Sequence, residues 1–349
     1  MQRALCALAL AASACGGRYG GTPIARPGTA AAPSGGIEGA ALPYQILDAR
    51  TGRQIDTAAF WEQLASKHAV CVGEEHSNPH HHWMQLEIVR HLAKQWPELA
   101  LGMEMFQRPF QGVLDDYAAK RISADALRSR TGYEERWGYD FNFYGPTIDA
   151  VVAGHGVLLA LNAPKELTKK IAHHGLESLT ATEKSQVPEL ELHDSAHRAW
   201  FDDLMETMGG SSAHSMKKPD APAPADSKPD AAKHDEGDEA PEMPSADRIY
   251  TVQVTWDETM ADTAVKWLRA TPNGRIVILA GTGHCHDSAI VNRIKRRGIS
   301  DVVSVRSVVD DGEGGVAEVL AKPANDYLVV LELSADAKAK LKEKAKAAE

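Results

Sequence analysis

The chain has 349 residues, of which 43% are hydrophobic, and a formal net charge of −10 at pH 7. A chain of this length and composition buries a sizeable core, as one large domain or as two modest ones. The pI is near 5.8 and no stripe of Lys and Arg alternates with aromatic residues, so nucleic acid is not expected as a partner.

The first fourteen residues predict an export signal. Arg3 precedes an apolar run over residues 4–12, which is too short to span a membrane, and small residues stand directly before Cys15. Small residues followed by cysteine are typical of a lipoprotein cleavage site, so we expect removal of residues 1–14 and a lipid on Cys15. The alternative is an ordinary cleavage site that leaves Cys15 unmodified. Later apolar runs are too short to cross a bilayer, so the lipid is the expected membrane contact.

Two stretches lack large apolar residues in a regular pattern. Residues 15–42 are dominated by Gly, Ala, Pro and Thr and predict a flexible tether. Residues 209–247 are rich in Pro, Asp, Lys and Glu and predict a disordered loop. The folded part is therefore expected over 43–208 and 248–333. Residues 334–349 alternate Ala, Lys and Glu, which predicts a solvated C-terminal helix.

Short apolar runs alternate with longer segments of helical period, which predicts an α/β fold. Its mainly parallel sheet is expected to carry helices on both faces. After the first run, Ser77-Asn78-Pro79 favours the start of a helix with an apolar stripe over 83–96. Residues 107–146 show no strand pattern and predict a smaller helical subdomain. The expected strands are 68–72, 99–103, 157–161, 275–280, 302–305 and 327–331.

Polar residues follow four of these strands. They are the segments Gly73-Glu74-Glu75-His76 and Gly281-Thr282-Gly283-His284, together with Glu104 and Asn162. Ligands of open parallel sheets bind beyond the carboxyl ends of the strands, so two histidines and up to three carboxylates are expected on one rim. A shared functional site and a structural polar network are both consistent with this pattern. A functional cluster of this kind supports metal ligation or proton transfer between Glu and His.

Two further groups of residues bear on this rim. The run His80-His81-His82 cannot chelate one ion as a whole, because successive helical residues point about 100° apart, and at most one faces the rim. Cys71 and Cys285 are the cysteines of the expected folded part. A dense disulfide framework is therefore excluded, while pairing of these two depends on the strand order.

Residues 137–144 are aromatic-rich in a chain with only 6% aromatic residues. One interpretation is a core plug between the helical subdomain and the sheet. The other is a flat apolar surface that stacks on a planar ligand, with phenol oxygens that coordinate ferric iron.

Six segments in register resemble ChaN-type lipoproteins of the Tiki superfamily, from about Leu42 to Leu333. They are Gly73-Glu74-Glu75-His76, Gly102-Met103-Glu104-Met105-Phe106, residues 137–146, Leu161-Asn162-Ala163-Pro164, Gln253 with Asp257, Met260 and Ala261, and Gly281-Thr282-Gly283-His284. The resemblance implies a parallel-sheet domain with a smaller helical part, attachment to the outer membrane, and a role in haem or iron acquisition. Gly16 agrees with the outer membrane, because many lipoproteins retained at the inner membrane carry Asp after the lipid cysteine.

The resemblance implies two alternative functions. In one relative a tyrosine holds the haem iron and two haems face each other across a dimer, which implies a homodimer here with Tyr144 as first and Tyr139 as second candidate ligand. The wider superfamily includes metal-dependent proteases and esterase-like hydrolases. On that analogy, Glu75, His76, Glu104 and His284 form a catalytic set, and His76, Glu104 and His284 hold a divalent metal.

Overall fold

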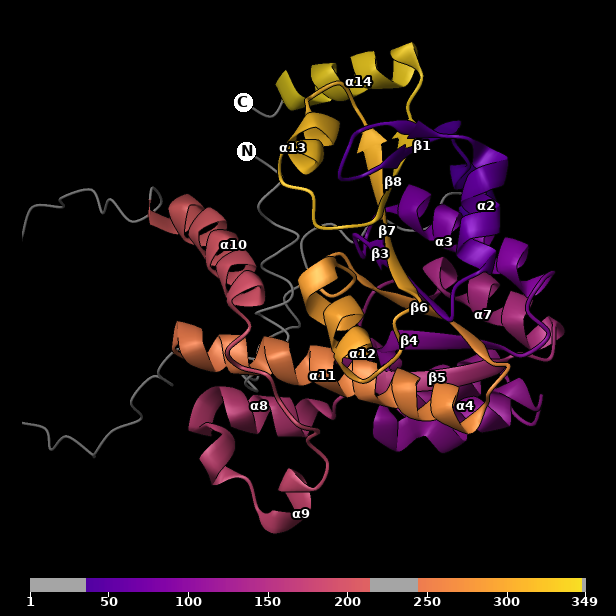
Figure 1. Ribbon diagram of the computed structural model, residues 1–349. Helices are drawn as coiled ribbons and strands as arrows, with labels where there is room; N and C mark the ends of the chain where they lie inside the picture. Colours follow the sequence, from indigo (N-terminus) through magenta and orange to yellow (C-terminus); the bar gives the residue numbers. More distant parts are fainter. Residues whose placement is uncertain (1–35, 214–243, 347–349) are drawn as a thin grey trace, which may run out of the picture.

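The computed structural model describes residues 36–213 and 244–346, which form one eight-stranded sheet flanked by helices (Figure 1). The strand order is β2-β1-β8-β7-β3-β6-β4-β5. All pairs from β8 to β5 are parallel, and β1 is antiparallel to both of its neighbours. The predicted α/β class is confirmed. The strands are β1 (Tyr44–Asp48), β2 (Gln54–Ile55), β3 (Ala69–Glu74), β4 (Leu99–Gln107), β5 (Val157–Asn162), β6 (Arg275–Gly281), β7 (Val302–Asp310) and β8 (Tyr327–Glu332).

Helices cover both faces of the sheet, as predicted. Figure 1 shows α11 (Ala246–Ala270) and α12 (Asn292–Arg296) across one face. The other face is covered by α2 (Thr57–Ala65), α3 (Pro79–Ala93) and α7 (Gly145–Ala153). The remaining helices are η2 (Ile37–Ala40), η3 (Arg108–Phe110), α4 (Gln111–Ala118), α5 (Ala124–Thr131), α6 (Tyr133–Arg136), η4 (Phe141–Phe143), α8 (Lys165–His174), η5 (Leu176–Ser178), α9 (Ala181–Lys184), α10 (Ser195–Ala213), η6 (Asp287–Val291, a π-helical segment), α13 (Gly315–Ala321) and α14 (Ala335–Lys346).

The start of α3 follows from its sequence. The Asn78 side chain accepts a hydrogen bond from the backbone N–H of His80, and Pro79 occupies the first helical position. The predicted stripe is buried at Trp83, Leu86 and Val89. These contacts fix the helix directly beyond the carboxyl end of β3. Between β4 and β5 the chain forms short helices, as expected for the helical subdomain.

The predicted tether and loop are too long where the structure describes them. Ile37 is fully buried and Ala40 is 1% exposed, because η2 packs into the core, so the predicted tether over 15–42 is wrong for its last residues. Likewise α10 continues to Ala213 and α11 begins at Ala246, inside the predicted loop 209–247. The signal segment, Cys15 and the rest of both stretches lie outside the described residues. Among the helices described, none is long and apolar enough to cross a bilayer.

A disulfide joins β3 to the turn that follows the neighbouring strand β6. Cys71 of β3 is bonded to Cys285, which lies four residues beyond the end of β6, and the two Cα atoms are 5.4 Å apart. Because β6 is the neighbour of β3, the turn after β6 folds back beside Cys71. Both cysteines are fully buried. The strand order therefore decides the pairing that the sequence left open.

Candidate functional site

Four neighbouring strands place their polar ends at one edge of the sheet. β3 and β6 are in register up to Glu74 and Gly281, and β4 and β5 lie next to β6. The histidines that follow β3 and β6 are therefore brought to Glu104 of β4, as predicted from the sequence. Two carboxylate and imidazole clusters form there.

The first cluster is centred on Glu74, which is 1% exposed. Its Oε1 accepts hydrogen bonds from Nδ1 of His76 (2.8 Å) and from the Tyr144 hydroxyl (2.7 Å). Nδ1 of His82 lies 3.2 Å from Oε2. Burial alone would raise the pKa of Glu74, but His82, His76 and Tyr144 together lower that pKa to about 2. Glu74 is thus held as a carboxylate.

His76 connects this cluster to solvent. Its ring is 8% exposed and packs against Trp137 and Tyr139, with centroid distances of 4.7 and 4.8 Å. Burial lowers its pKa, but the hydrogen bond to Glu74 and the charges of Glu104 and Glu74 outweigh burial and raise the pKa above its ordinary value. Because Glu74 fixes Nδ1–H, the second nitrogen, Nε2, is available near Gly281. His76 is therefore placed to transfer a proton.

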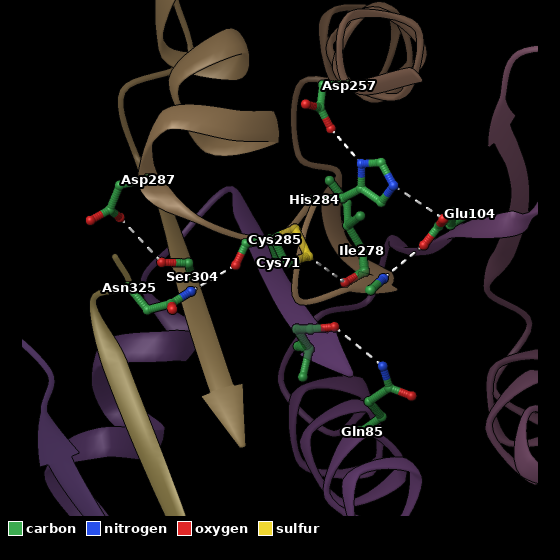
Figure 2. Close-up of a disulfide and its surroundings, with 12 residues drawn as sticks. Cys71, Gln85, Glu104, Asp257, Ile278, His284, Cys285, Asp287, Ser304 and Asn325 are labelled. Carbon is green, nitrogen blue, oxygen red and sulfur yellow. Dashed lines mark hydrogen bonds and ion pairs between the residues drawn. A yellow bond between two sulfur atoms is a disulfide. The ribbon is translucent and has the colours of Figure 1, made fainter. Parts of the chain in front are cut away.

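The second cluster holds His284 between two carboxylates (Figure 2). Nδ1 lies 2.6 Å from Asp257 and Nε2 lies 3.3 Å from Glu104, whose other oxygen accepts the backbone N–H of Gly281. Carboxylate oxygens face both ring nitrogens, an arrangement that favours the doubly protonated imidazolium form of His284. Burial opposes the charge, but Glu104 and Asp257 raise the pKa of His284 to about 10.

Asp257 extends the second cluster into the interior of the protein. Its other oxygen lies 3.1 Å from Nε2 of His197, and Arg293 lies next to it at 3.9 Å. All three side chains are buried. Asp257 entered the sequence analysis only through the family resemblance, and His197 was missed. A lone buried histidine on a helix has no spacing that distinguishes it from a packed residue.

The structure places Glu75 outside both clusters. This side chain is exposed, and its Oε2 accepts a hydrogen bond from Asn78 at 3.3 Å. Side chains alternate along a strand, and β3 continues to Glu74, so Glu74 faces the cluster and Glu75 points away. Glu74 takes the place that the sequence analysis gave to Glu75.

The structure also argues against Tyr144 as a ligand of haem iron. Tyr144 is 1% exposed, and its hydroxyl donates to Glu74. Burial, together with the charge of Glu74, raises its pKa well above the ordinary value and disfavours a tyrosinate. Tyr139, the second candidate, is only partly buried and lies at the surface beside His76.

The predicted metal set does not fit a metal ion. His76, Glu104 and His284 are brought together, but no group of three His, Cys, Asp or Glu side chains in the described part of the chain is arranged to hold one. The His80-His81-His82 run also diverges, as expected. His80 contacts the carbonyl of Ala40, His81 accepts from the backbone N–H of Glu75, and His82 faces Glu74.

A small pocket of about 60 Å³ opens at this edge of the sheet. Aromatic side chains form one part of its wall, and polar side chains from β4, α6 and α8 form the other. It is lined by His76, Glu104, Met105, Gln107, Arg136, Trp137, Tyr139, Asn162, Ala163, Lys165, Thr168 and Trp256. The aromatic segment 137–144 is therefore divided: Phe143 and Tyr144 are core residues, while Trp137 and Tyr139 line the pocket.

Comparison with known proteins identifies the family. The family model described as haem-binding uptake, Tiki superfamily, ChaN matches residues 60–294, which is more than half of the chain. The chain belongs to this ChaN family. The resemblance seen in the sequence is thus confirmed, and the ChaN match spans β3 to β6 with every residue of the two clusters.

Individual relatives are distant. The structure of ChaN of Campylobacter jejuni with cofacial haem is 17% identical, covers 82% of this chain and 96% of that chain, and has a TM-score of 0.58, which shows a common fold. A mutant of the erythromycin esterase EreC, in its open conformation, is 10% identical, covers 83% of this chain and 97% of that one, and has a TM-score of 0.39. The chloroplastic protein RETICULATA-RELATED 5 of Arabidopsis thaliana is 27% identical over 137 residues, which are 37% of this chain and 18% of that protein. The chain therefore spans less than a fifth of that relative.

Proposed function

We propose that this ChaN-family protein binds haem over the pocket beside His76. Its family is described as one of haem-binding uptake, and a relative with the same fold binds haem cofacially. The observation that carries the proposal for this chain is the pair Trp137 and Tyr139, two aromatic side chains that line a pocket at the carboxyl edge of the sheet. Flat aromatic rings suit a porphyrin, and a phenol oxygen suits ferric iron.

The size of the pocket indicates how haem would lie. Sites that enclose a drug-sized ligand measure roughly 300–1,000 Å³, whereas this pocket measures about 60 Å³. Haem would therefore lie across the mouth, with one face toward Trp137 and Tyr139 and the other face open. A second copy of the chain would cover the open face, so a homodimer belongs to the proposal. Tyr139 is the proposed iron ligand, because Tyr144 is buried and bonded to Glu74.

A titration of the purified protein with hemin tests this proposal. Saturable binding with a shifted Soret band is expected for the wild type and for Tyr144→Phe, and a different spectrum with weaker binding for Tyr139→Phe. The two variants remove the same hydroxyl group five residues apart, so each is the control for the other. Absence of saturable binding to the wild type would overturn haem binding. An unchanged Tyr139→Phe spectrum would overturn the ligand assignment alone.

We further propose export, a lipid on Cys15, attachment to the outer membrane and a role in haem or iron acquisition. The disulfide between Cys71 and Cys285 supports export, because such bonds persist in oxidising compartments. Labelling cells with a radioactive fatty acid tests the lipid anchor, with Cys15→Ser as the unlabelled control. Equal labelling of Cys15→Ser would reject the anchor.

Membrane fractionation tests attachment to the outer membrane. Growth on hemin as iron source tests the role in haem or iron acquisition.

Hydrolysis is the second candidate function, and the Glu74 and His76 pair favours it. Glu74 orients the imidazole through Nδ1, so Nε2 of the neutral ring can accept a proton from a water molecule that attacks an ester or amide carbonyl carbon. The same proton can then pass to the departing alcohol or amine as the C–O or C–N bond breaks. No step is assigned to a metal, since the residues do not fit one. A panel of aryl esters and peptides tests this candidate. Any turnover should fall about 10²–10⁴-fold in His76→Ala, and turnover that survives in that variant rejects the assignment.

A further inference from the structure

The polar wall of the pocket is built around Gln107, the last residue of β4. Its side-chain Oε1 accepts two hydrogen bonds, from the Arg136 guanidinium at 2.8 Å and from the backbone N–H of Lys165 at 3.1 Å. These two donors fix the orientation of the amide, because the reversed amide would place its NH₂ group against them. The residue is only 8% exposed and lines the pocket. In the described part of the chain no partner accepts from its NH₂ group, which is therefore left as a donor for the pocket.

The charges around Gln107 favour an anion. Lys165 and Arg136 line the pocket, and α8 begins at Lys165, so the positive end of a ten-residue helix lies at the same wall. Glu104 is the acidic residue in this lining, and its two oxygens are already occupied by His284 and the Gly281 N–H. The ammonium group of Lys165, which lines the pocket, donates a hydrogen bond to the carbonyl of Glu135 at 2.9 Å. The lining thus contains two cationic side chains and one acidic one, and Arg136 is also paired with Glu166 of α8, at 2.7 Å, outside the lining.

We infer that this pocket is a carboxylate subsite, in which the NH₂ group of Gln107 and the ammonium group of Lys165 receive the carboxylate arm of a planar ligand. A pocket of about 60 Å³ admits a few water molecules, at roughly 10–15 Å³ for each, which is the scale of a short carboxylate arm and far below that of a ring system. The planar body stays outside, against Trp137 and Tyr139. The inference rests on the proposed function in one respect: for haem, the arm is a propionate.

Hemin and its dimethyl ester, both dispersed in the same mild detergent, provide the test. The wild type is expected to bind the diacid at least tenfold more tightly than the ester. The reason is that a hydrogen bond to a charged group contributes a binding free energy that corresponds to a change in Kd of about tenfold or more. Gln107→Glu keeps an oxygen for Arg136 and Lys165 but replaces the donor with a negative charge, so it should abolish the preference. An equal preference in the wild type and in Gln107→Glu would overturn the subsite.

A matched pair on α8 separates a local contact from a general charge effect. Lys165→Gln should reduce the preference for the diacid about tenfold, whereas Lys169→Gln, which removes the same charge from an exposed position one turn along, should retain it. If Gln107→Glu fails to fold, the two lysine variants still test whether the pocket is a carboxylate subsite. Equal losses in the two lysine variants would reject a specific role for Lys165.

The subsite and haem binding can fail separately. If hemin does not bind the wild type, the proposed function fails, and the subsite is judged by titration with sodium propionate alone. NMR of the side-chain amide of Gln107 should then show a saturable shift in the wild type that is lost in Lys165→Gln. A Gln107 amide that does not respond to propionate would overturn the inference even if hemin binds.

Discussion

At the scale of single residues, the charge on His284 makes stability depend on pH. The folded state raises its pKa from the ordinary 6.5 to about 10. Its contribution to stability is therefore fully present below about pH 6.5 and is lost as the pH rises through 10. We expect the free energy of unfolding in urea to fall between pH 7 and pH 10, and to fall less in Asp257→Asn, which lacks one of the two carboxylates. A wild-type value that stays level over this range would contradict the imidazolium.

The adjacent glutamates Glu74 and Glu75 provide a matched comparison at the same scale. Glu74→Gln removes the charge that faces His76 and His82, and breaking a buried pair of this kind costs about 3–5 kcal/mol. Glu75→Gln changes an exposed side chain, so its effect should stay within about 0.5 kcal/mol. Urea unfolding at pH 7 measures both. Equal losses of stability would show that the Glu74 cluster contributes nothing beyond a surface charge.

At the scale of elements, the predictions from sequence succeed where burial is complete and fail at the ends of strands. The six parallel strands are unbroken apolar runs because helices cover both faces, and all six were predicted. β1 and β2 were missed, since they are short, antiparallel and follow a Gly-rich stretch. Each predicted strand continues past its expected carboxyl end. For β3 this extension to Glu74 decides which of two adjacent glutamates faces the site, and periodicity alone does not locate such an end.

The end of β6 is packed so closely that only glycine fits. A Cβ atom on Gly281 would lie 2.9 Å from Cε1 and 3.2 Å from Nε2 of His76. Gly281→Ala should therefore push the His76 ring aside, with a loss of stability of about 1–3 kcal/mol and weaker hemin binding. Gly112→Ala is the control, because its Cβ in α4 would meet open space and alanine favours a helix by up to about 1 kcal/mol. NMR of the His76 ring measures the displacement, and an undisturbed ring in Gly281→Ala would contradict the packing.

At the scale of the whole molecule, the segments before and after the predicted loop 209–247 contribute alternating strands to one sheet. β6, from the second part of the chain, lies between β3 and β4 from the first, and β7 lies on the other side of β3. The turn 73–76 therefore comes from the first segment and the turn 281–284 from the second. The two clusters form only when β6 takes its place between β3 and β4. The predicted loop interrupts one domain and does not separate two, so the motifs on both sides of it contribute to one site.

The Cys71–Cys285 disulfide should stabilise this arrangement as a whole. The bond closes a stretch of 214 residues in sequence, and removal of a native disulfide typically costs about 2–5 kcal/mol, largely because the unfolded chain gains freedom. Replacement of both cysteines by alanine should lower the free energy of unfolding by that amount and make it insensitive to reductant. In the native wild type both sulfur atoms are buried, so reductant should act only as fast as the protein opens. Unfolding curves with and without reductant test this effect on stability: coincident curves for the wild type and the double variant would show that the bond adds no stability.

The double variant should also bind hemin more weakly, because Cys285 follows His284 directly.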